Sequence, residues 1–233
     1  MKRLNSPLGR NFIVALLLLL LLPATTLTQD ENGCRLRFTG VDRKNVKIRK
    51  PKTRPAYSFV NGGRAISVPE WFTFVCSLDE DAPARRSEIP KSVAMDVEAF
   101  HVKIRAHILA AKLEPDNDIH VQIGDSAKWN QPQVVIEIPP GANFCEARTA
   151  FMDLVRADGG ERVSRSDGYI FKTPPLAEIE GYLFLDSAHI PARSRRSDYC
   201  STSGNQGIKN KLRRSPVRGL WELHPVFKIV PVT

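Results

Sequence analysis

Apolar and polar residues alternate along the segment VEAFHVKIRAHIL, residues 97–109. Phe100, Val102, Ile104, Ala106 and Ile108 alternate with His101, Lys103, Arg105 and His107. A helix would also align several of these apolar residues, but the strict period of two and the β-branched content favour a half-buried strand. On that strand we expect His101 and His107 to face solvent.

Two further strands follow at IHVQI (119–123) and VVIEI (134–138). They are separated by the turn-forming residues 114–118 and 125–132, and Pro139-Pro140 stops the second of them. Within it, Glu137 is expected to face outward.

The period then changes from two to that of a helix. Asn143 is a candidate N-cap, one helix face would carry Ala147, Phe151, Leu154 and Val155, and Gly159-Gly160 would end the helix. Strands return at about 177–186 and at LWELHPVFKIV, 220–230. Because Pro225 has no N–H, it must lie at an edge or a bulge of the last strand.

The element order is therefore three strands, a helix and two strands. This order predicts a mainly β fold, an OB-like five-stranded antiparallel barrel with one helix between strands 3 and 4. A generic small antiparallel barrel or sandwich with one helix is the alternative. OB barrels bind oligonucleotides or oligosaccharides on the face of strands 2 and 3, between the 1–2 and 4–5 loops.

The chain before the barrel divides into two segments. Residues 1–28 combine a basic start, eleven apolar residues from Phe12 to Leu22 and a polar end, which is typical of a secretory signal peptide and too short for a membrane span. Residues 29–95 are predicted to be a basic arm and an extension with a strand at ISVPEWFTFVCSL (66–78), and residues 96–233 the barrel domain. We expect a secreted or periplasmic protein with no transmembrane span in the mature chain.

Four cysteines fit export, because disulfides persist in oxidising compartments. Their positions favour the pairs Cys34–Cys76 and Cys145–Cys200, although sequence leaves all three connectivities open.

Charge is unevenly distributed along the chain. The formal net charge is +9, of which the predicted signal peptide contributes +3. Residues 43–54 carry seven basic groups and no acid, and residues 193–214 carry seven basic groups and one acid, so the rest of the mature chain is acidic, at −7. Basic segments of this kind either bind polyanions or are solvated loops.

Several acids and histidines fall where the 1–2 and 4–5 loops of such a barrel would meet. They form the candidate metal set Asp118, His120, Asp186, His189, Glu222 and His224. Carboxylates with imidazoles bind divalent metals, and they also serve general acid–base catalysis, for which Glu222, His224 and His120 are the candidates. The same residues also fit a structural role, closing the barrel rim by hydrogen bonds.

The 4–5 loop and the strand after it supply a second kind of candidate. A polyanion, either nucleic acid or an anionic glycan, would be contacted by Arg193, Arg195, Arg196, Lys209, Lys211, Arg213, Arg214 and Trp221. The apolar surroundings of Trp221, however, favour a core position for this residue. Sequence thus favours a binding protein for a polyanion or carbohydrate; the alternatives are a divalent-metal-dependent, nuclease-like hydrolase and an envelope protein-interaction module.

The motifs EPDNDIHVQIGD, VVIEIPPGANFCEAR, IEGYLFLDSAHI and LWELHPVFKI resemble, in this order, a set found in uncharacterised secreted bacterial proteins. The resemblance covers about residues 97–230. It implies a shared fold and a shared site at Asp118, His120, Asp186, His189, Glu222 and His224, and it implies no particular activity.

Overall fold

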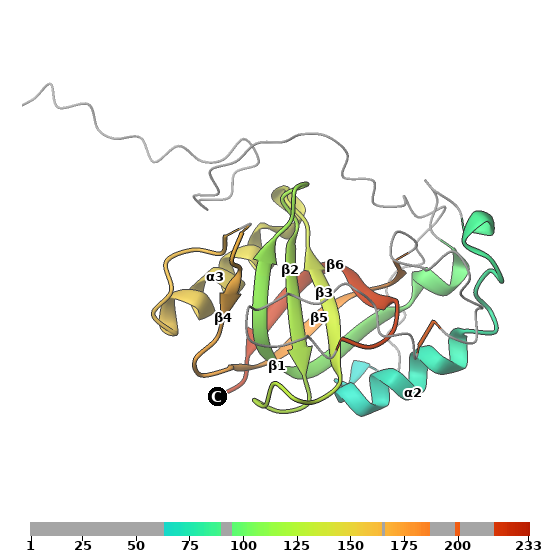
Figure 1. Cartoon of the computed structure of the whole chain (residues 1–233), viewed down its shortest axis with the longest axis horizontal. Helices are drawn as coiled ribbons and strands as arrows, with labels where there is room; N and C mark the ends of the chain where they lie inside the picture. Colours follow the sequence, from blue (N-terminus) through green and yellow to red (C-terminus); the bar gives the residue numbers. More distant parts are fainter. Residues whose placement is uncertain (1–62, 90–94, 165, 187–198, 201–216) are drawn as a thin grey trace, which may run out of the picture.

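The computed structural model describes residues 63–89, 95–164, 166–186, 199–200 and 217–233. Five strands close into a barrel (Figure 1), and the remaining strand, β4, is a short pairing on β1. The strands are β1 (His101–Leu113), β2 (Ile119–Gly124), β3 (Gln133–Ile138), β4 (Tyr169–Ile170), β5 (Leu176–Leu185) and β6 (Trp221–Pro231). The mainly β class and the closed five-stranded barrel are therefore confirmed.

The barrel strands follow the order β1–β2–β3–β6–β5 and return to β1. Four of the five pairings are antiparallel, and β3–β6 is parallel, with Ile136 opposite Leu223. The prediction of a wholly antiparallel barrel is therefore wrong. The reason is topological: directions can alternate around a closed ring only if the number of strands is even.

Apolar side chains of alternate strand positions fill the barrel. Ile104 and Ile108 of β1, Val121 of β2, Ile136 of β3 and Leu223 of β6 are all in this core. Since successive residues of a strand point to opposite faces, the neighbouring polar residues lie on the outer face of the barrel.

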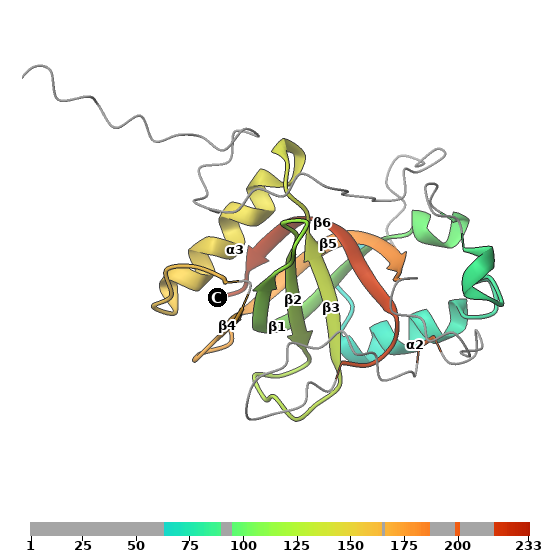
Figure 2. The same ribbon diagram turned by 45° about the horizontal axis from the view of Figure 1, so that its top comes forward.

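Helix α3 (Cys145–Ala157) packs against β6 at one side of the barrel (Figure 2). It follows the short turn η5 (Ala142–Phe144), so its N-cap is Phe144 and the predicted cap at Asn143 is wrong. The predicted apolar face is present, with Ala147, Phe151 and Val155 buried.

The segment predicted as a strand at 66–78 is instead helix α2 (Val68–Leu78). Ser67 and Glu70 form a capping box in which each side chain accepts from the other's backbone N–H. Val68, Trp71 and Val75 then recur at helical spacing and are buried against the barrel core. The aromatic and β-branched composition that suggested a strand was overridden by this cap and this period.

Only Ile66, before α2, joins the sheet, where it forms a parallel bridge with Ile104. Two 3₁₀ turns, η3 (Arg86–Glu88) and η4 (Asp96–Ala99), lie between α2 and β1. No helix within the described ranges is both long and apolar enough to cross a membrane.

Pro225 lies at a bulge, as its missing N–H requires. Gly181 of β5 is opposite Val226, whereas Leu183 is opposite Leu223, so β6 has one extra residue beside Tyr182. The glycine makes room for this irregularity, because a Cβ at position 181 would lie 2.9 Å from the Pro225 carbonyl oxygen.

A disulfide joins Cys76 of α2 to Cys200, which precedes β6. Both predicted pairs, Cys34–Cys76 and Cys145–Cys200, are therefore wrong; Cys145 is also disulfide-bonded, and Cys34 lies outside the described residues. The prediction relied on closeness in sequence. The fold instead brings the end of α2 beside the approach to β6, 124 residues away.

Candidate metal centre

Three neighbouring strands bring an acidic and histidine-rich cluster together. Asp118 directly precedes β2, Glu137 is the next-to-last residue of β3, and Glu222 and His224 lie near the start of β6. The register places His120 opposite Glu137, and the parallel β3–β6 pairing places Glu137 beside the two residues of β6.

A tight turn aims Asp118 at this cluster. Asn117 adopts a left-handed conformation with φ of 73°, which asparagine tolerates better than most residues. The Asp118 N–H donates to Oδ1 of Asp116 at 3.2 Å, and the Glu114 N–H donates to the Asp118 carbonyl at 2.9 Å. This turn fixes the entry into β2.

His224 is the centre of the cluster. Its Nε2 lies 3.3 Å from Oδ2 of Asp118, and its Nδ1 lies 3.0 Å from Oε2 of Glu137 and 3.4 Å from Oε1 of Glu222. The other oxygen of Glu137 lies 3.2 Å from Nδ1 of His120. One imidazole is thus surrounded by three carboxyl groups, and a second imidazole contacts the shared Glu137.

These side chains are on the outer face of the barrel, yet they are almost inaccessible. The side chains of Asp118, Glu222 and His224 are 3%, 4% and 9% exposed, and Glu137 is the most exposed at 17%. Beyond the atoms in these ion contacts, Oδ1 of Asp118 and Nε2 of His120 are also buried, and neither has a hydrogen-bond partner among the residues that the structure describes. Such atoms are uncommon in folded proteins, and an ion is one of the explanations they call for.

The carboxylates determine the protonation of His224. Burial acts to lower the pKa of His224, but its bonds to Asp118 and Glu137 and the charge of Glu137 outweigh burial and raise that pKa well above its ordinary value. Conversely, burial acts to raise the pKa of Glu137, but the hydrogen bonds with His120 and His224 outweigh it and hold that pKa far below its ordinary value. His224 therefore carries a positive charge and Glu137 a negative one at neutral pH.

The pKa of Glu222 is shifted in the opposite direction to that of Glu137. Burial raises its pKa well above the ordinary value, and the negative charge of Glu137 raises it further. Burial also raises the pKa of Asp118, against the effect of His224. Within one cluster the pKa of Glu137 is thus lowered and that of Glu222 is raised, and the rise at Glu222 comes from burial and from the neighbouring negative charge.

The donor set fits a divalent cation. One ligand atom each from Asp118, Glu137 and His224 can be chosen so that all three lie within 4.8 Å of one another. Two carboxylate oxygens and an imidazole nitrogen suit zinc and other divalent transition metals.

The structure brings together four of the six predicted metal residues: Asp118, His120, Glu222 and His224. Asp186 follows β5, where its N–H donates to the Leu220 carbonyl at 2.9 Å, and it is close enough to help raise the pKa of Glu222. His189 lies outside the described residues.

Sequence reasoning missed Glu137, which shares contacts with both histidines. It was expected to face outward, as it does, but the outer face here is where the cluster forms. Its spacing relative to the 114–118 turn was the available signal, because an antiparallel hairpin places the end of β3 opposite the start of β2.

Two other predictions about side chains are corrected. Trp221, a candidate ligand contact, is 2% exposed and its Nε1 donates to Oδ1 of Asp79 at 2.7 Å, so it is a core residue. His101, expected in solvent, is 1% exposed, lies 3.4 Å from Glu180 and packs against Phe227. The remaining polyanion candidates lie outside the described residues: Arg193, Arg195, Arg196, Lys209, Lys211, Arg213 and Arg214.

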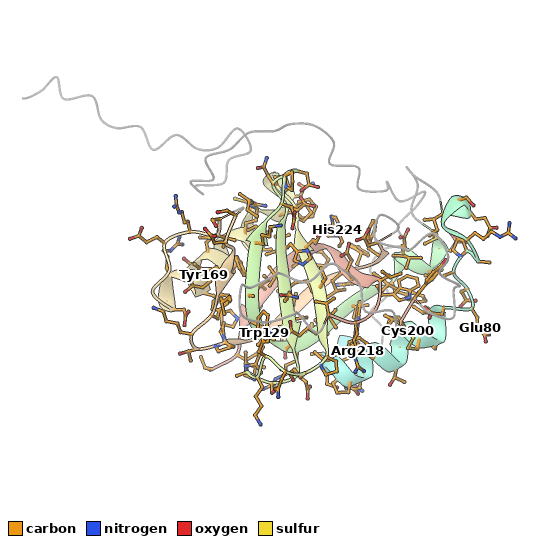
Figure 3. The ribbon with its side chains drawn as sticks, viewed as in Figure 1. Glu80, Trp129, Tyr169, Cys200, Arg218 and His224 are labelled. Carbon is orange, nitrogen blue, oxygen red and sulfur yellow. A yellow bond between two sulfur atoms is a disulfide. The ribbon has the colours of Figure 1, made fainter. Side chains whose placement is uncertain are left out.

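Figure 3 shows His224, the centre of the cluster, toward one end of the β2–β3 hairpin and Trp129 toward the other end.

No protein-family model matches the chain, and comparisons with curated proteins and with solved structures find no match either.

Proposed function

We propose that the protein binds a divalent metal ion, with Asp118, Glu137 and His224 as protein ligands and His120 and Glu222 around them. The observation that carries the proposal is the convergence of these three ligand atoms within 4.8 Å at a buried position. His120, hydrogen-bonded to Glu137, would orient that carboxylate as outer residues of metal sites do.

The competing explanation is that the His224 imidazolium itself neutralises the carboxylates. Ion contacts at 3.0 to 3.4 Å agree with that role. Two features favour a metal. The acids outnumber the single imidazolium at the centre of the cluster. Within the described part of the chain, Oδ1 of Asp118 and Nε2 of His120 are also buried without a hydrogen bond. Burying such groups is unfavourable unless something compensates them.

We further propose that the barrel is OB-like, because the cluster lies on the outer face of β2 and β3, the face on which OB barrels bind their ligands. The helix α3 between β3 and β5 agrees with this fold. Fold alone does not fix the ligand.

Metal titration of the oxidised, metal-stripped protein tests the proposal. Calorimetry with zinc, manganese and calcium should show one-to-one binding of at least one ion, and Glu137→Gln and His224→Gln should each abolish it. His101→Gln is the matched control, because His101 is equally buried and pairs with Glu180 away from the cluster. An absence of binding, or unchanged binding in His224→Gln, would refute the proposal.

A metal held by three protein ligands keeps coordination positions for water or substrate, which is the arrangement of catalytic sites. A metal-dependent hydrolase is therefore the second candidate. When bound, such a metal would polarise a phosphoryl oxygen and acidify water. Turnover of bis(p-nitrophenyl) phosphate that EDTA abolishes and zinc or manganese restores would identify it.

Binding of a polyanion is the third candidate, supported by the seven basic groups of residues 193–214 and the seven of residues 43–54, outside which the mature chain is acidic. It predicts binding to single-stranded DNA or heparin that weakens steeply between 50 and 200 mM salt, on the order of tenfold or more, through counterion release. If neither salt-sensitive binding of these polymers nor EDTA-sensitive turnover were found, an envelope protein-interaction module would be favoured.

A further inference from the structure

The β2–β3 pairing includes Glu137 but does not extend to Asp118. The β2–β3 ladder ends at the pair Ile119 and Ile138, so Glu137 lies one residue inside the ladder and Asp118 one residue outside it. The distance between these two carboxylates therefore depends on something besides strand pairing.

Arg148 of α3 supplies a connection at this point. Its Nη1 donates to the Asn117 carbonyl at 3.0 Å and to the Ile138 carbonyl at 2.9 Å. Asn117 immediately precedes Asp118, and Ile138 immediately follows Glu137. The Arg148 side chain is 2% exposed, so water does not compete well for these carbonyls.

We infer that Arg148 is a positioning residue for the metal site, holding Asp118 at a fixed separation from Glu137. The inference rests on the proposed metal binding. Because Nη1 of Arg148 bonds to the carbonyls of both Asn117 and Ile138, it links the two chain segments just beyond the last β2–β3 pair. Helix α3, anchored on the barrel through Phe151 and Val155, holds that nitrogen in place.

If Arg148 acted only through its charge, its removal would change metal affinity in the opposite direction to that expected from a positioning role. A buried positive charge repels a cation, so removing it would strengthen metal binding. The positioning role predicts weaker binding, because a second support for the ligand backbone is lost. A role confined to stability would lower the unfolding midpoint and leave the dissociation constant of the folded protein unchanged.

The experiment compares Arg148→Met and Arg148→Lys with the wild type, and with Arg156→Met as control. Arg156 belongs to the same helix but is exposed and pairs with Asp153. Zinc affinity is measured by competition calorimetry well below the unfolding midpoint of each variant, and coordination is followed by the visible absorption of the cobalt-substituted protein.

Arg148→Met should weaken zinc binding by about ten- to a hundredfold, the usual effect of losing an outer support, and should alter the cobalt spectrum. The zinc affinity of Arg148→Lys should lie between those of Arg148→Met and the wild type, because its ammonium keeps the charge and a donor. The zinc affinity of Arg156→Met should match that of the wild type. If Arg148→Met does not fold, Arg148→Lys decides.

Unchanged or tighter binding in Arg148→Met, or in Arg148→Lys where only that variant folds, would overturn the inference and leave the metal site intact. An absence of zinc binding in the wild type would overturn both the proposed metal site and the positioning role of Arg148.

Discussion

Asp79 connects α2 to the start of β6, and its removal should destabilise the protein more than any other change to an acid of that segment. Its Oδ1 accepts from Nε1 of Trp221 at 2.7 Å, and its Oδ2 accepts from the Cys200 N–H at 3.1 Å. The residue is 4% exposed, and Trp221 is 2% exposed. Replacing Asp79 with alanine leaves one buried donor and one partly buried donor without these acceptors.

The expected magnitude follows from those two bonds. A hydrogen bond to a charged group contributes about 1.5–3 kcal/mol, so Asp79→Ala should lower the free energy of unfolding by about 3–6 kcal/mol. Asp79→Asn should cost about 1–3 kcal/mol, because one carbonyl oxygen can still accept from Trp221. For a domain of this size, the alanine variant should unfold roughly 6–24 °C lower.

The assay is urea and thermal unfolding followed by tryptophan fluorescence, with the disulfides intact. Asp81→Ala is the control, because Asp81 is exposed on the same segment and should change stability by no more than about 0.5 kcal/mol. A cycle with Trp221→Phe should give a coupling energy of about 1–3 kcal/mol between Asp79 and Trp221. Equal stability of Asp79→Ala and Asp81→Ala, or zero coupling, would refute the reasoning.

Three further outcomes are expected. Because the pKa of His224 is raised well above its ordinary value, a metal that binds this imidazole must displace its proton. Metal affinity should therefore increase about tenfold per pH unit below that pKa, and calorimetry in buffers of different ionisation enthalpy measures the released proton. A metal affinity that does not change with pH would exclude His224 as a ligand. Replacing Cys76 and Cys200 with serine should lower the free energy of unfolding by about 4–5 kcal/mol on the chain-entropy account, since the bond closes a loop of 124 residues; urea unfolding of the double variant checks this. Gly181→Ala should cost about 1–3 kcal/mol, because the added Cβ meets the Pro225 carbonyl oxygen at 2.9 Å, and an equally stable variant would show that the bulge can shift.

The barrel strands were predictable because each carries its own pattern. Alternation in β1 and the apolar runs of β2 and β3 were bounded by turn residues, and Pro225 indicated the bulge in β6. These signals are local, so they do not depend on how the rest of the chain folds. The helical period of α3 was equally local, although its cap moved from Asn143 to Phe144.

The errors occurred where local signals conflicted or were absent. The residues of α2 have strand-forming composition and helical spacing at once, and the capping box of Ser67 and Glu70 decided between them. Disulfide pairing has no local signal at all. Cys76 meets Cys200 only because α2 packs beside the chain that enters β6, which is a property of the whole fold.

The candidate site shows how far spacing alone can lead. D-x-H at residues 118–120 and E-x-H at 222–224 each place two side chains on one face of a strand, and this identified four members of the cluster. Glu137 is not part of either two-residue motif, and it joins the cluster because β3 is adjacent to β2 on one side and to β6 on the other.

That parallel adjacency of β3 and β6 is also what the odd number of strands requires, so the feature that the sequence-based topology lacked is the one that completes the site. The parallel register aligns Ile136 with Leu223, so the residues that follow them, Glu137 and His224, lie side by side on the outer face of the barrel. The 3.0 Å contact between His224 and Glu137 therefore depends on the register of this pairing as much as on the two residues themselves.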